Sequence, residues 1–274
     1  LQQFAALLGE FVPAPALEKN GMRQLEIVTQ ALELAQLPFE VLEEADEDLI
    51  VTRRIRQPWP TPAISRRKRP RVLYAWAEPR RMQVPHERHR RLLDEYLGDW
   101  DDAIVEVGNA SLEDLTRHIR DEEAGFSHIY VLAHGISAKD NPSERLKLLS
   151  ESEPSTCLAL GDGNQLQRCT TTDLENLFAE GTPRPEAFVL ATCDSGEVNA
   201  IESGGTLAHA LHRSGVPVVV ASQFELTQAG ADRLVDVFLQ QIMFGEDPRK
   251  ALQHCRQRLR QSADLTYYDR VAVV

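Results

Sequence analysis

Short apolar runs alternate with helical patterns from Arg71 onward, and this alternation constrains the fold more than any other feature. The runs predicted as strands are Val72–Ala77, Ile104–Val107, Ile129–Ala133, Phe188–Thr192, Val216–Ala221 and Val271–Val274. Most of them are separated by apolar residues at helical spacing. This pattern is typical of a parallel sheet covered by helices on both faces. The sequence therefore predicts an α/β fold, an αβα sandwich with a mostly parallel central sheet.

Capping residues mark where the intervening helices begin. We expect helices to start at Ser111, Thr172, Thr227 and Asp247. Thr172 with Glu175 predicts a capping box, and Pro248 suits the first position of the last helix. Between two strands the alternation breaks: a polar insertion, 137–156, precedes a predicted hairpin around Asp162.

The first seventy residues follow a different pattern. We expect a helix at Met22–Leu37, then a hairpin of two extended runs beginning at Pro38 and Leu49. A stretch rich in Pro and Arg, 57–70, reads as a linker. The predicted division is 1–70, a segment packed on the main domain, and 71–274, the main domain. Because the chain begins at Leu1 and ends inside an apolar run, we expect a truncated C-terminus and a missing neighbouring domain.

The charge balance restricts the partners of the chain. It has 42 acidic and 30 basic residues and a formal net charge of -12, which repels phosphate backbones, so direct nucleic-acid binding is not expected. No secretory signal and no apolar run long enough to span a membrane is present, so we expect a cytoplasmic protein without membrane contact. Four scattered cysteines do not form a disulfide framework, and they are predicted to be reduced thiols.

Two chemically active side chains follow predicted strands. His134 comes directly after one buried run and Cys193 after another. Ligands of open parallel sheets bind outside the carboxyl ends of the strands, so these two residues are expected at one end of the sheet. A thiolate is a strong nucleophile, and a nearby histidine can take its proton and return it to a leaving amine. We predict His134 and Cys193 as a catalytic pair. Taken singly, each also suits a structural role, a small buried apolar group for Cys193 and a hydrogen-bonded histidine for His134.

Acyl transfer also needs hydrogen-bond donors for the oxyanion. Gly135 has no side chain to keep its N–H from a substrate, and the N–H of Cys193 is the predicted second donor. No cofactor motif is present. Two H-x-x-H pairs, at His86 and His209, lack a third ligand, so we expect no metal site.

Several segments resemble the CHAT family, caspase-like domains related to caspases, separases and legumain-type proteases. They are YVLAHG, LALGDGNQLQRCTTTDL, FVLATCDSG, LPFEVL and the C-terminal half from Gly204 to Leu259. The resemblance implies a caspase-hemoglobinase fold and a cysteine endopeptidase, with Cys193 as nucleophile and His134 as general acid or base. It also implies a protein substrate, a cleft lined by residues 222–225, and roles in bacterial antiviral defence or cell death under a regulatory domain or activating partner.

The sequence departs from metacaspases, because Ala191 stands where they have an aspartate two positions before the cysteine. Other acidic residues would have to recognise a basic substrate. We expect substrate binding by Asp162, Asp194, Gln223, Phe224 and Glu225. A desolvated carboxylate pairs well with a guanidinium, so the hypothesis is cleavage after a basic residue.

Two alternatives remain open. One is a non-catalytic CHAT-like interaction module whose cleft binds a partner, although the presence of both His134 and Cys193 argues against it. The other is a thiol hydrolase acting on a small molecule, against which the long polar insertion favours an extended cleft.

Overall fold

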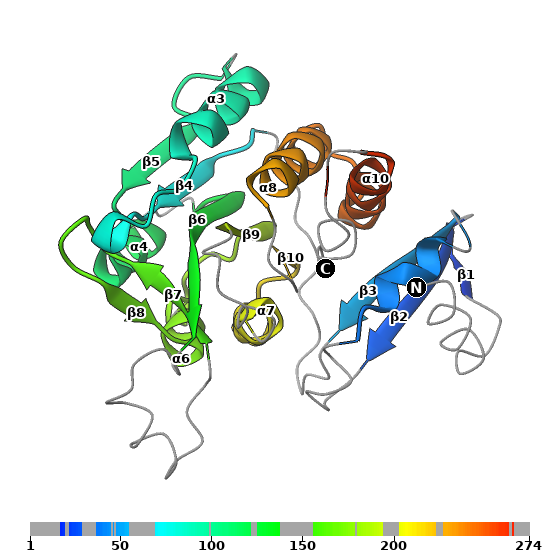
Figure 1. The fold of residues 1–274 in the computed structure, drawn as a ribbon, viewed down its shortest axis with the longest axis horizontal. Helices are drawn as coiled ribbons and strands as arrows, with labels where there is room; N and C mark the ends of the chain where they lie inside the picture. Colours follow the sequence, from blue (N-terminus) through cyan, green and yellow to red (C-terminus); the bar gives the residue numbers. More distant parts are fainter. Residues whose placement is uncertain are drawn as a thin grey trace, which may run out of the picture.

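The computed structural model describes residues 17–19, 22–28, 37–44, 46, 48–54, 69–98, 100–121, 125–137, 156–178, 180–193, 203–222, 227–262 and 265. Its centre is a seven-stranded sheet (Figure 1). Five parallel strands lie in the order β10 (Val219–Ala221), β9 (Ala187–Cys193), β6 (His128–Ser137), β4 (Val72–Trp76) and β5 (Ile104–Gly108). Strand β7 (Thr156–Leu160) pairs antiparallel with the end of β6, and β8 (Gln167–Cys169) pairs antiparallel with β7.

Side chains of the central strands alternate between two apolar cores. Tyr130 and Leu132 of β6 belong to one core, whereas Ile129, Val131 and Ala133 belong to the other. Both faces of the sheet are therefore buried, which explains why the strands read as continuous apolar runs. The predicted α/β sandwich with a mostly parallel sheet is confirmed.

Helices cover both faces of the sheet. The first core is closed by α3 (His86–Leu97), α8 (Gln228–Leu234), the π-helical turn η5 (Val235–Leu239), α9 (Gln240–Met243) and α10 (Pro248–Gln261). The second is closed by α4 (Leu112–Asp121), α6 (Thr171–Asn176) and α7 (Ser203–Arg213). A further short 3-10 turn, η2 (Pro79–Arg81), follows β4.

Capping explains where most of these helices begin. The hydroxyl of Ser111 accepts a hydrogen bond from the N–H of Asp114, and that of Thr227 from the N–H of Gly230. Asp247 caps α10 through the N–H of Arg249. These three helix starts are as predicted.

The start of α6 differs from the prediction. The cap is Thr170 rather than Thr172, and it forms a reciprocal capping box with Asp173 rather than with Glu175. The run of three threonines offers several possible caps, and the end of β8 at Cys169 makes Thr170 the first residue free to serve as one.

The N-terminal segment was predicted wrongly at two places. Residues 22–28 form a strand, β2 (Met22–Val28), instead of the beginning of a helix, and 39–44 form the 3-10 helix η1 (Phe39–Glu44) instead of a strand. β2 pairs with β1 (Leu17–Lys19) and runs parallel to β3 (Leu49–Arg54), so a long-range partner overrides local helix propensity. The extended run at Leu49 is a strand as predicted. The linker to residue 68 and the run 271–274 lie outside the described residues.

A buried ionic cluster attaches the N-terminal sheet to α10, which lies beside it in Figure 1. Arg256 is 1% exposed, and its Nη1 donates to Glu43 Oε1 at 2.6 Å and to the carbonyl of Val51 at 2.8 Å. Arg53 makes two bonds to the carboxylate of Glu40, each 2.7 Å. Strand β3 and the turn η1 are thereby fixed to α10.

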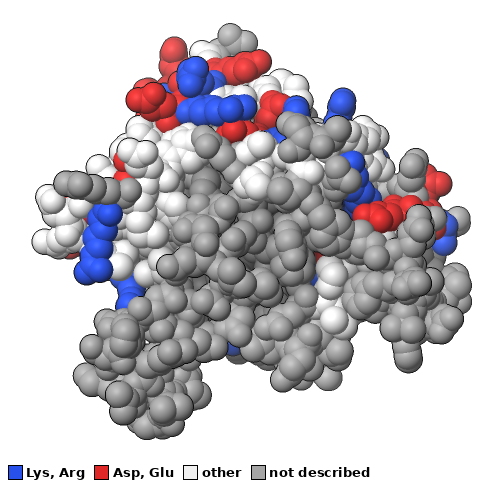
Figure 2. All heavy atoms as spheres, in the orientation of Figure 1, with Lys and Arg blue, Asp and Glu red and all other residues white. Residues whose placement is uncertain are grey.

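Charges at the surface are mixed in sign. Figure 2 shows acidic and basic side chains side by side over the edge formed by α3, where Arg90 pairs with Asp94 and Glu106. Within the described part of the chain, no helix is both long and apolar enough to cross a membrane.

Candidate functional site

The strand register places His134 and Cys193 beside each other. β6 and β9 are parallel, and residue 134 is the direct register partner of residue 193, the last residue of β9. Adjacent strands lie about 4.8 Å apart. Two residues far apart in sequence therefore meet at the carboxyl edge of the sheet.

Beyond this pair, the described strands pair with β6 on one side. β4 pairs with β6 only as far as Leu132, and β7 takes over on that same side from His134 to Ser137. On the β9 side, no described strand pairs with β6 after His134. Gly135 lies at this point, opposite Leu158 of β7.

The imidazole of His134 is buried and oriented. His134 is 4% exposed, and its Nε2 lies 3.0 Å from the carbonyl oxygen of Gln83. A carbonyl can only accept, so Nε2 carries the proton and donates it. In the neutral ring Nδ1 then holds a lone pair, and among the described residues this buried nitrogen has no hydrogen-bond partner. Within the described part of the chain, Nδ1 is therefore the ring nitrogen that can accept a proton.

The carbonyl of Gln83 is itself held in place. The neighbouring Val84 donates its N–H to Glu78 Oε1 at 3.0 Å, and Ala77 donates to the carbonyl of Leu132 on β6. The segment between β4 and α3 is therefore attached to the sheet near His134. Sequence reasoning missed Gln83, because a backbone carbonyl carries no sequence signal.

Three of the four cysteines, Cys157, Cys169 and Cys255, are buried. Cys169 and Cys255 are fully buried, and desolvation is the main cause that raises the pKa of each thiol, for Cys255 to about 12. Cys157 is 3% exposed and directs its sulfur at the carbonyl of Ile136, 3.7 Å away. These three are packing residues, and Cys193 remains as the candidate nucleophile.

The structure describes only some of the predicted substrate-binding residues. Asp162 lies in the hairpin turn between β7 and β8, where Oδ1 accepts the N–H groups of Asn164 and Gln165. Its carboxylate thus stabilises its own turn. The other four, Asp194, Gln223, Phe224 and Glu225, lie outside the described residues.

The histidines of the two H-x-x-H pairs have the following surroundings. Among the described residues no group of three possible ligands was found. His86 stacks on Trp76 with ring centres 3.8 Å apart, while His89 bonds to Tyr130 and Asp232. His212 directs Nδ1 at the carbonyl of Val216. These rings have structural partners instead.

Comparison with known proteins gives one family. The sequence model of the CHAT domain matches residues 2–270, nearly the whole chain. No curated protein matches the chain. CHAT domains are related to caspase-like cysteine peptidases, and the mostly parallel seven-stranded sheet flanked by helices agrees with a caspase-like fold. The chain belongs to the CHAT domain family.

Proposed function

We propose that this protein is a cysteine endopeptidase that hydrolyses peptide bonds of a protein substrate through Cys193 and His134. The observation that carries the proposal is the state of His134: Nε2 donates to the Gln83 carbonyl, and Nδ1 has no hydrogen-bond partner among the described residues, while residue 134 is the register partner of Cys193. A purely structural histidine would be expected to use both ring nitrogens.

We propose the following chemistry at this pair. Nδ1 of His134 accepts the thiol proton of Cys193, and the thiolate attacks the carbonyl carbon of the scissile bond. The N–H groups of Gly135 and Cys193 are the proposed donors to the oxyanion. When the C–N bond breaks, the protonated Nδ1 gives its proton to the leaving amine. Water then hydrolyses the thioester with His134 as base.

For specificity we propose cleavage after a basic residue. The net charge of -12 favours a basic substrate. Both hydrogen bonds to Asp162 use Oδ1, and no described residue donates to its Oδ2. We propose Asp162, Asp194 and Glu225 as the acidic residues that bind the basic side chain, and Gln223 and Phe224 as further substrate-binding residues.

The proposed setting is the bacterial cytoplasm, in defence or cell death, under the control of another domain or partner. In this proposal residues 1–70 form a segment packed on a peptidase domain, 71–274. The alternative, a non-catalytic interaction module, would have the same fold but no reactive thiol.

The test is covalent labelling of the full-length protein by a peptide chloromethyl ketone ending in arginine. We expect an adduct on Cys193, none in Cys193→Ala, and a labelling rate lowered about 10²–10⁴-fold in His134→Ala. Cys157→Ser is the control and should label like the wild type. Peptides ending in alanine or aspartate should label more slowly.

Each contrary result has a distinct meaning. Equal labelling of His134→Ala and the wild type would contradict the catalytic pair. A preference for alanine or aspartate would refute only the basic specificity. Absence of any Cys193 adduct, with all three peptides and with candidate activators present, would favour the interaction module.

A further inference from the structure

A buried chain of three polar side chains crosses the core between β6 and α8. Nε2 of His89 lies 3.0 Å from Asp232 Oδ1, and Nδ1 lies 2.6 Å from the hydroxyl of Tyr130. Since a carboxylate only accepts, Nε2 carries the proton, and in the neutral ring Tyr130 donates to Nδ1. His89 and Tyr130 are fully buried, and the side chain of Asp232 is 5% exposed. Each hydrogen bond therefore donates in the same direction, from Tyr130 to His89 and from His89 to Asp232.

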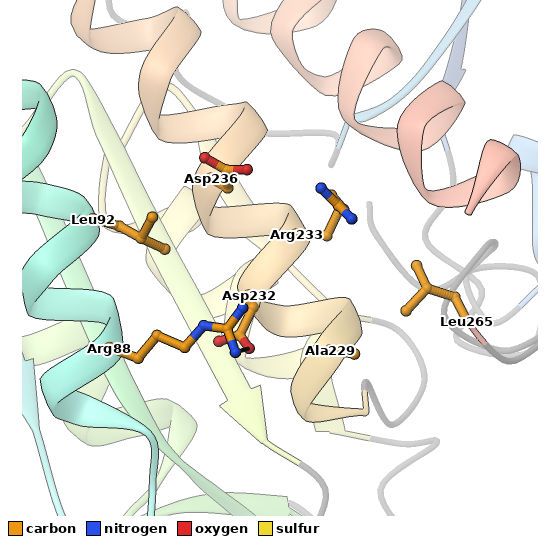
Figure 3. A pocket seen from close by; sticks show the side chains of 7 residues that line it. All are labelled: Arg88, Leu92, Ala229, Asp232, Arg233, Asp236 and Leu265. Atoms are coloured by element: carbon orange, nitrogen blue, oxygen red, sulfur yellow. Dashed lines mark ion pairs between the residues drawn. The ribbon is translucent and has the colours of Figure 1, made fainter. Parts of the chain in front are cut away.

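This chain adjoins a groove of about 520 Å³ between α3 and α8–η5. Figure 3 shows Arg88 reaching from α3 toward Asp232 on α8. The Arg88 Nη1–Asp232 Oδ2 distance is 2.9 Å, yet this buried oxygen accepts no hydrogen bond of acceptable geometry from the described residues. The Arg88 side chain is 59% exposed, whereas that of Asp232 is 5% exposed. The buried carboxylate of Asp232 therefore carries a desolvation cost that its exposed counter-ion offsets only in part.

The same segment of chain that carries His89 also carries Gln83, whose carbonyl orients His134. β6 contacts this segment twice, through Tyr130 at His89 and through His134 at Gln83. Tyr130 and His134 are four residues apart on one strand, and so on one face of it. The His89–Tyr130 bond thus sets how closely the start of α3 approaches β6.

A second tyrosine strengthens the attachment. Tyr74 of β4 stacks on Tyr130 with ring centres 5.5 Å apart, and its hydroxyl donates to the carbonyl of His86 at 2.8 Å. The first turn of α3 is therefore bound to β4, β6 and α8 by side chains. Apolar side chains of the same volume would stabilise the fold as well or better. Stability alone therefore does not explain why Tyr130, His89 and Asp232 are polar.

We propose that Asp232 and His89 are positioning residues for His134. Asp232 holds His89 with Nδ1 as acceptor; His89 then binds Tyr130, and this bond places the Gln83 carbonyl where it keeps Nε2 of His134 protonated and Nδ1 basic. The importance of this arrangement for catalysis rests on the proposed function. The arrangement itself is a property of the His134 ring that can be measured separately.

The test uses full-length protein and the variants Asp232→Asn and Tyr130→Phe. In Asp232→Asn, the amide oxygen can accept from Nε2 of His89 only if the amide NH2 points toward the Arg88 guanidinium, which is unfavourable. In the reverse orientation the NH2 donates to Nε2, and His89 then carries its proton on Nδ1. Tyr130→Phe removes only the hydroxyl and keeps the ring stack, so it guards against misfolding. ¹⁵N-histidine spectra report the His134 tautomer, and alkylation by iodoacetamide across pH reports Cys193.

We expect the wild-type His134 to be protonated at Nε2 and both variants to show a mixture of tautomers. The Cys193 alkylation rate should fall about 10- to 100-fold, with a changed pH profile. The matched control is Asp236→Asn. Asp236 accepts a hydrogen bond from Tyr96, which also joins α3 to the helix carrying Asp232 but lies at the far end of α3 from Gln83. It should leave both readouts unchanged.

The outcomes separate the two proposals. Unchanged His134 spectra in Asp232→Asn and Tyr130→Phe would overturn the positioning role, as would an equal change in Asp236→Asn, which would mean general loosening of α3. If instead the His134 tautomer shifts as expected while Cys193 alkylation never depends on His134, the positioning role stands and the catalytic pair fails.

Discussion

At the scale of single residues, burial decides the charge of His209 on α7. Desolvation is the main cause that lowers its pKa to about 4, with Arg213, Arg53 and His212 adding to the effect. The folded protein keeps this ring neutral, whereas the unfolded chain takes up a proton below about pH 6.5. The unfolded state therefore binds more protons in this range, and the free energy of unfolding should fall as the pH drops from about 6.5 toward 4.

The prediction is checked by urea unfolding of the wild type and His209→Gln at pH 7 and pH 4.5. The wild type should lose more stability on acidification than the variant, because glutamine does not titrate. His254→Gln, an exposed histidine on α10, is the control and should behave like the wild type. A pH dependence that is the same in all three proteins would contradict the buried neutral state.

At the scale of elements, the β7–β8 hairpin depends on Gly161. Its φ is +107°, and a Cβ there would lie 2.5 Å from the carbonyl oxygen of Gln165. Gly161→Ala should lower the free energy of unfolding by about 1–3 kcal/mol, because the left-handed backbone and the close contact are both strained. The hairpin buries Leu158, Leu160 and Cys169, so urea unfolding should detect the loss.

Gly163 in the same turn is the matched control. A Cβ at this position meets nothing within 4 Å, so Gly163→Ala should change stability by less than about 0.5 kcal/mol. Equal effects of the two substitutions would show that the turn does not have the described conformation.

At the scale of the whole molecule, the Arg256 cluster joins the N-terminal strands to the C-terminal helix. Removing one member leaves Glu40 and Glu43 buried with fewer counter-ions. Arg256→Ala should therefore destabilise the protein by about 3–5 kcal/mol in urea unfolding. Arg258→Ala, an exposed position on the same helix, is expected to change little. A small effect of Arg256→Ala would mean that β3 and α10 are not closely packed.

The local sequence was a good guide where residues act through their own strand or helix. The runs at 72–76, 129–133 and 188–192 are strands whose apolar residues are buried on both faces and so continuous in sequence, and the run at 104–107 is an edge strand in which Glu106 is exposed. It failed at 22–28, where pairing with β3 decides the conformation, and at Thr172, where the end of the preceding strand selects Thr170 instead.

Local sequence patterns were enough for the α/β class, the positions of the main strands, three helix starts and the two residues worth considering, His134 and Cys193. Only the tertiary structure decided that these two share a register position, that the Gln83 carbonyl holds one nitrogen of the imidazole, and that His89 bonds to Tyr130 and Asp232. The physical reason is that periodicity and capping are local, whereas the ladder and the buried hydrogen bonds join groups far apart in the chain. A backbone carbonyl, moreover, is the same chemical group in every residue, so its role depends on position alone.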